Sequence, residues 1–160
     1  MSLLIFPWSI ISQPLWSSYA EAFKRFDFKW IKSTYKKILK LFALVVFGIF
    51  ILNFLFDHIT LFWINEKLNI TSFDIFAMGV LVLAIMWCNI HYDIMFGVGI
   101  YKFGLITSLI GIILKFSSVY LIISIDVVNV FSIVLTSIFA YTVFNILAPI
   151  KIISILKSNK

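Results

Sequence analysis

The residue in this sequence with the clearest capacity for chemistry is Lys115. It is the only charged residue in the apolar stretch from about 103 to 125. A charged side chain inside a membrane-length segment is costly and is by default functional. An ammonium group that faces a cavity can hold an anionic group such as a phosphate. The alternative is structural: the ammonium pairs with an acidic or carbonyl group in the bundle, or its flexible stem carries it out to the membrane surface.

Asn89 and Asp93 are the second pair of candidate residues. They lie one helical turn apart in another apolar stretch, so they share one helix face. Such residues can line a polar cavity that binds a substrate, or they can form hydrogen bonds that hold neighbouring helices together.

Residues for other kinds of chemistry do not form a recognisable pattern. The sequence has no metal-ligand spacing, no GxGxxG motif and no Walker loop. His58 and His91 are expected near opposite ends of the bilayer, where they cannot share a site. The single Cys88 cannot form an internal disulfide. We therefore expect a protein that is not an enzyme and that uses no metal or cofactor.

The composition predicts an all-α integral membrane protein. Hydrophobic residues make up 62% of the chain and charged residues 12%, and the mean hydropathy is +1.10. A soluble domain has about 25% charged residues. The apolar runs are long and unalternated, which excludes the alternating strands of a membrane barrel. The net charge of +6 is not a nucleic-acid signal, because the basic residues cluster at the ends of the apolar runs.

The chain is predicted to form a single transmembrane domain over residues 1–160. Pro7 and Pro14 interrupt its apolar beginning, which is short for a membrane span. An aromatic stripe opposite lysines then predicts an interfacial amphipathic helix. The predicted elements are a partial span (1–16), an interfacial helix (17–37), four full spans (about 38–63, 73–96, 103–125 and 127–148) and a tail (149–160).

Basic residues predict the orientation of these spans, because Lys and Arg near span ends stay on the cytoplasmic side. Lys102 and the tail residues Lys151, Lys157 and Lys160 fall on the same side as the 14–40 segment, whereas the outer loops contain only Lys67. We therefore expect a cytoplasmic C-terminus. The basic residues of the 14–40 segment are expected to set topology and to contact anionic lipid: Lys24, Arg25, Lys29, Lys32, Lys36, Lys37 and Lys40.

Small residues follow one stripe of the 103–125 span. Gly104, Ser108, Gly111 and Ser118 share this stripe with Lys115, at spacings of three and four. Small residues allow helices to approach closely in lipid, so this stripe predicts a helix-packing face.

The segment PLWSSYAEAFKRFDFKWIKSTYKKILK resembles the cytoplasmic junction of Wzx-type polysaccharide flippases, the O-antigen and capsule exporters of the multidrug/oligosaccharidyl-lipid/polysaccharide exporter superfamily. LFWI at 61–64 is also similar. The family often has Gly before the Asp, where this chain has Phe26. The matching positions are Pro14, Leu15, Trp16, Tyr19, Ala22, Asp27, Trp30 and Ile31.

The resemblance implies that the chain is the C-terminal fragment of a roughly twelve-span exporter that works by alternating access. Its substrate would be an undecaprenyl-pyrophosphate-linked oligosaccharide, carried across the bacterial inner membrane. Its partners would be membrane lipid, an N-terminal half and other polysaccharide-assembly proteins. The alternatives are a drug or lipid exporter fragment of the same superfamily, or a small structural or accessory membrane subunit.

Overall fold

The computed structural model describes residues 2–64 and 70–158. Within these ranges the chain is all α-helical, with five helices and no strand. The helices are α1 (Ser2–Lys24), α2 (Phe28–Ile64), α3 (Ser72–Gly97), α4 (Tyr101–Ser124) and α5 (Val130–Ser158). Among the described residues, α2 to α5 are long and apolar enough to cross a membrane, which confirms the predicted class. The shortest, α4, would reach about 36 Å at 1.5 Å per residue, beyond the ~30 Å hydrocarbon core.

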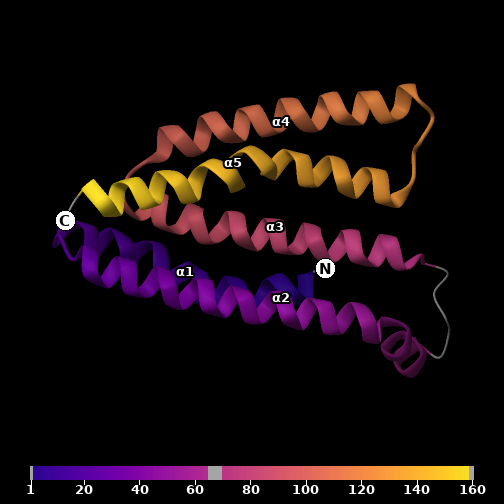
Figure 1. Ribbon diagram of the computed structural model, residues 1–160, viewed down its shortest axis with the longest axis horizontal. Helices are drawn as coiled ribbons and strands as arrows, with labels where there is room; N and C mark the ends of the chain where they lie inside the picture. The colour runs from indigo at the N-terminus through magenta and orange to yellow at the C-terminus, as the bar shows by residue number, and fades with distance from the viewer. Residues whose placement is uncertain (1, 65–69, 159–160) are drawn as a thin grey trace.

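Helix α3 is the centre of the bundle and contacts each of the other four helices. Helices α1 and α2 lie on one side of α3, and the α4–α5 pair lies on the other (Figure 1). The α1–α2 turn, the α3–α4 turn and the end of α5 gather at one end of the bundle, on the left of Figure 1. Because the basic residues Lys24, Lys102 and Lys157 lie at these element ends, we call this the basic end.

The prediction of one continuous helix over 17–37 is wrong, since the chain turns between α1 and α2. Phe26 adopts a left-handed conformation with φ of 57°, which an L-residue inside a helix does not adopt. The Asp27 carboxylate then accepts a hydrogen bond from the backbone N–H of Trp30 at 2.9 Å, which caps the start of α2. Helix α1 passes through Pro14 and has no boundary at 16–17, where the partial span was predicted to end. Helix α2 continues from the turn directly into the first predicted full span.

The predicted end of the last span at 148 is also wrong. Helix α5 continues through Pro149 to Ser158, so the described part of the predicted tail is helical. A proline lacks the N–H that bonds the carbonyl four residues earlier, and a helix passes through it when another donor satisfies that carbonyl. Here the indole of Trp87 does so. The outer-loop Lys67 and the terminal Lys160 lie outside the described residues.

The core is apolar and is concentrated around the basic end of α3. Ile31 of α2, Ile94 and Met95 of α3 and Ile152 of α5 are almost fully buried. Large apolar side chains such as Phe62, 90% exposed, cover much of the outer surface. An apolar exterior around a packed core is what a helical bundle in lipid requires.

Candidate functional site

A cavity of about 380 Å³ lies between α3, α4 and α5. Apolar side chains from all three helices form part of its wall, including Leu81 and Ile85 of α3. Polar groups gather in the same cavity, which is the arrangement that ligand sites commonly show. The polar lining residues are Tyr92, Thr107, Ser108, Lys115, Ser137 and Tyr141.

Lys115 reaches this cavity because of the way α4 packs on α5. Gly111 is buried one turn before Lys115, and a Cβ added there would collide with the backbone carbonyl of Ala140. Only a glycine permits such close contact between the two backbones. Lys115 shares the face of Gly111 and therefore points toward the space beside α5. Lys115 lines the cavity but is itself exposed. Its ammonium forms no ion pair with any residue in 2–64 or 70–158, so its charge is available to a ligand.

Tyr92 forms the wall of the cavity nearest the basic end. Its hydroxyl is hydrogen-bonded to the Ser108 hydroxyl and donates to the carbonyl of Gly104, with an O–O distance of 3.3 Å. Its ring stacks on Phe144 of α5, with the ring centres 4.2 Å apart and the planes 11° apart. Tyr92 therefore joins all three helices at one point and fixes the shape of the cavity there.

The structure does not bring Asn89 or Asp93 into this cavity. Each follows a cavity-lining residue, Cys88 or Tyr92, by one position, which rotates it about 100° around α3. Asp93 lies one turn before Gly97, on whose face α1 packs through Trp16 and Tyr19. Both polar residues are half-buried and belong to the side of α3 that faces α1.

The four small residues of the predicted stripe have different environments. Gly104 is buried against the Tyr92 ring, Ser108 bonds Tyr92, and Gly111 contacts Ala140. Ser118 is outside the cavity lining, and its hydroxyl donates to the carbonyl of Leu114 in its own helix at 2.8 Å. The close packing is therefore concentrated in the half of α4 nearer the basic end.

The seven basic residues of the 14–40 segment are all exposed. One ion pair forms among the described residues, between Arg25 and Glu21 at 2.5 Å, and it is exposed on both sides. The remaining six lysines extend from the end of α1 along the first turns of α2. They form a positive surface at the basic end that can contact anionic headgroups.

A buried polar network next to the cavity was not found from the sequence. His91 is 0% exposed; its Nδ1–H donates to the Trp87 carbonyl at 2.6 Å and its Nε2 accepts from the Tyr35 hydroxyl at 3.0 Å. The Trp87 carbonyl requires the proton on Nδ1, and the neutral imidazole then presents Nε2 as the acceptor for the Tyr35 hydroxyl. The Trp87 indole N–H donates to the Asn145 carbonyl at 3.1 Å, and the Asn145 amide donates to the Ala84 carbonyl at 3.0 Å.

One sequence signal pointed to this network. Pro149 leaves the Asn145 carbonyl without its helical donor, and a buried carbonyl in lipid must find another. The signal identifies the acceptor but not the donor, because Trp87 is 58 residues away. In the part of the chain that the structure describes, no group of three or more His, Cys, Asp or Glu residues could hold a metal ion.

Comparison of the chain with protein-family models, with curated proteins and with solved structures finds no match.

Proposed function

We propose that this chain is the C-terminal bundle of a flippase that moves lipid-linked oligosaccharides across the bacterial inner membrane. The observation that carries the proposal is the cavity between α3, α4 and α5, whose lining includes the exposed, unpaired cation Lys115 together with hydroxyl groups. In this proposal the protein is a transporter rather than an enzyme, and its partners are membrane lipid and an N-terminal half.

The chemistry of the cavity matches the two parts of such a substrate. A pyrophosphate loses its hydration when it crosses the hydrocarbon core, and a cation beside its path offsets part of that cost. Lys115 supplies the cation. Sugar hydroxyl groups need hydrogen-bond partners, and Ser108, Ser137 and Tyr141 offer hydroxyls along the same wall. The lysine binds phosphate as a point charge, so it suits a substrate that must be released again.

The turn between α1 and α2 lends support to the flippase resemblance. The residues that resemble the family surround this turn, from Pro14 to Ile31. Phe26 has a φ of 57°, in the left-handed region that favours glycine. It occupies the position where that family often has Gly, so the backbone has the conformation which a glycine would adopt there most easily.

Replacement of Lys115 tests the proposed function. We expect Lys115→Ala, introduced into the chromosomal gene, to lower surface polysaccharide about tenfold or more, because a hydrogen-bonded ion pair contributes ~1.5–3 kcal/mol. Lys115→Arg keeps the charge and should retain more polysaccharide than Lys115→Ala. The matched control is Lys102→Ala, since Lys102 is an exposed lysine of α4, like Lys115, but lies outside the cavity.

Two outcomes would contradict the proposal. If Lys115→Ala gives the wild-type amount of surface polysaccharide at an equal protein level in the membrane, Lys115 does not take part in transport. A gene deletion that lowers polysaccharide and is fully rescued by Lys115→Ala would instead favour the accessory-subunit alternative, because such a subunit acts through its surfaces and not through its cavity.

The proposal includes an orientation with the basic end in the cytoplasm. We expect a green fluorescent protein fused after Lys160 to fluoresce and an alkaline phosphatase fused at the same place to be inactive. The physical reason is the positive-inside rule, applied to the lysines around the α1–α2 turn. Substituting Glu for Lys29, Lys32, Lys36 and Lys37 together should shift the fusions toward the opposite pattern. An active phosphatase on the unaltered chain would overturn this orientation.

A further inference from the structure

Pro149 makes α5 easy to bend at one level of the bundle. The proline lies inside α5, and the helical hydrogen bond to the Asn145 carbonyl is missing. A bend at Pro149 does not have to break a hydrogen bond to the Asn145 carbonyl from within α5, because that bond is already missing. A bend elsewhere in a helix has to break the corresponding backbone hydrogen bond. Sharp helix kinks are concentrated at prolines for this reason.

The α3–α4 turn lies at the same level as Pro149. Helices α4 and α5 run in opposite directions, and Gly111 lies opposite Ala140. Nine residues back along α4 is Lys102, and nine residues forward along α5 is Pro149. The turn just before Lys102 contains Gly99, whose φ of 82° is in the left-handed region that favours glycine. Gly99 has no side chain, and no heavy atom lies within 4 Å of the position a Cβ would take. A proline inside α5 and a glycine in the α3–α4 turn therefore lie at the same level, at the basic end.

Beyond these two points, α4 and the first part of α5 form one hairpin. The hairpin is held together by the close contact of Gly111 with Ala140 and is drawn as a pair in Figure 1. The Lys115 cavity lies between this hairpin and α3. A rotation of the hairpin about Pro149 and the α3–α4 turn would widen or narrow the cavity.

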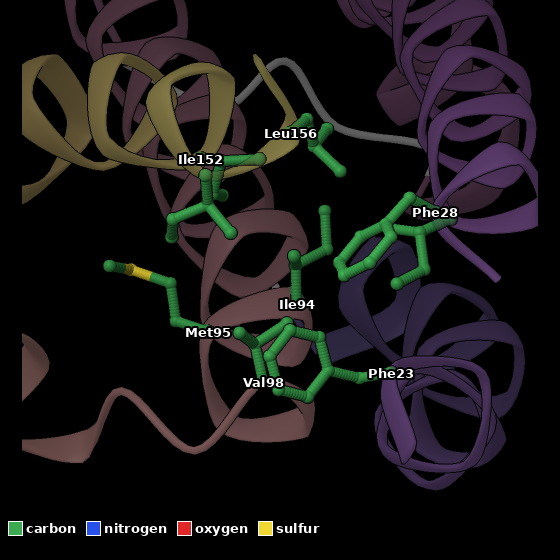
Figure 2. Close-up of a pocket in the computed structure, with 9 residues that line it drawn as sticks. Phe23, Phe28, Ile94, Met95, Val98, Ile152 and Leu156 are labelled. Carbon is green, nitrogen blue, oxygen red and sulfur yellow. The ribbon is translucent and has the colours of Figure 1, made fainter. Parts of the chain in front are cut away.

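The part of α5 after Pro149 stays with the other helices. Figure 2 shows Ile152 and Leu156 pointing toward Ile94 and Val98 of α3. Phe23 near the end of α1 and Phe28 at the start of α2 complete the group. Ile152 is 1% exposed, and the space that these residues leave is only about 10 Å³. Well-packed apolar groups resist displacement, so this segment anchors the hinge.

Trp87 and Asn145 hold the hairpin against α3. The Trp87 indole donates to the Asn145 carbonyl, and the Asn145 amide donates to the Ala84 carbonyl in return. This reciprocal pair, which we call the clasp, lies one turn before Pro149. The donor to the Asn145 carbonyl is therefore Trp87 of α3. The hairpin would break this hydrogen bond if it moved away from α3.

We infer that Pro149 and the α3–α4 turn form a hinge, and that the Trp87–Asn145 clasp holds the α4–α5 hairpin against α3 beside the Lys115 cavity. Trp87 is thus a positioning residue that acts through the hairpin. The assignment of this opening to substrate access rests on the proposed flippase function, whereas the hinge itself rests on the contacts described above.

The single cysteine of the chain provides the test. Cys88 lines the cavity and is 4% exposed, so we expect a thiol reagent to reach it faster when the hairpin opens. The full chain in lipid nanodiscs is treated with N-ethylmaleimide, and the labelled fraction is followed by intact-protein mass spectrometry. Trp87→Phe keeps the ring and removes the donor, and it should label about fivefold faster, as loss of one ~1 kcal/mol hydrogen bond predicts. Pro149→Ala restores the helical donor and should label about fivefold more slowly.

Trp63→Phe is the matched control, because Trp63 is 78% exposed on α2 and lies outside the cavity. Equal labelling rates in Trp87→Phe and Trp63→Phe would overturn the clasp. Faster labelling in Pro149→Ala would overturn the hinge, since general loosening of the bundle accelerates labelling and only a restored helix slows it. The assay contains no substrate, so a failed polysaccharide assay for Lys115 leaves this result intact and the two failures are distinguishable.

Discussion

Gly111→Leu is expected to separate α4 from α5 and to destabilise the bundle by about 3 kcal/mol or more. A Cβ at this position already collides with the Ala140 carbonyl oxygen, which belongs to the backbone and cannot rotate away. A leucine would force the two helices apart and enlarge the space beside Lys115. The measurement is the thermal midpoint of the purified protein in detergent, where we expect a decrease of about 6 °C or more.

Gly48→Leu provides the matched control for this experiment. Gly48 lies in the membrane-length part of α2, and a Cβ built there has no heavy atom within 4 Å. A leucine at Gly48 should be neutral or slightly stabilising, because leucine has the higher helix propensity and is apolar. Equal midpoints for the two variants would show that α4 and α5 do not approach as closely at Gly111 as the structure has them.

His91→Ala is expected to lower the free energy of unfolding by about 3 kcal/mol. The imidazole is fully buried, and its removal leaves a cavity beside Trp87 and an unpaired hydroxyl on Tyr35. In lipid such a hydroxyl has no water to bond. Unfolding in mixed micelles with increasing sodium dodecyl sulfate measures the change, and tryptophan fluorescence follows it because Trp87 is adjacent to the site.

His58→Ala and Tyr35→Phe separate the contributions to this effect. His58 is exposed on α2, and its substitution should change stability by less than about 0.5 kcal/mol. Tyr35→Phe keeps the ring and removes only the hydroxyl, so it should cost about 0.6–1.7 kcal/mol, the range of hydrogen bonds within membranes. A His91→Ala variant as stable as His58→Ala would mean that the buried network contributes nothing.

The turn at Phe26 shows why one boundary could not be predicted. The periodicity of aromatic and basic residues continues through 17–37, which predicted one helix. A short turn can leave the spacing of aromatic and basic residues along the sequence unchanged. The periodicity over 17–37 therefore contained no sign of the turn. The break results from the left-handed Phe26 and the Asp27 cap. A glycine at 26 would have been a stop signal, whereas phenylalanine is not.

The polar residues of α3 show the same limit in the candidate site. Asn89 and Asp93 were the cavity residues predicted on α3 from the sequence, whereas the structure places Tyr92 there. Their faces differ by about 100° per position, and only the placement of the neighbouring helices decides which face meets a cavity. The α4–α5 hairpin covers the face of Tyr92, and α1 covers the face of Asp93.

The sequence by itself determined the class of this protein, the number of membrane-length helices among the described residues and the concentration of basic residues near particular span ends. These properties depend on runs of about twenty neighbouring residues, so they are local. Only the tertiary structure decided that His91 is buried, that Trp87 satisfies the carbonyl freed by Pro149, and that Lys115 shares a cavity with Tyr92. Each of these depends on contacts between different helices, and helix packing in lipid is set by the shapes of facing surfaces rather than by hydrophobicity.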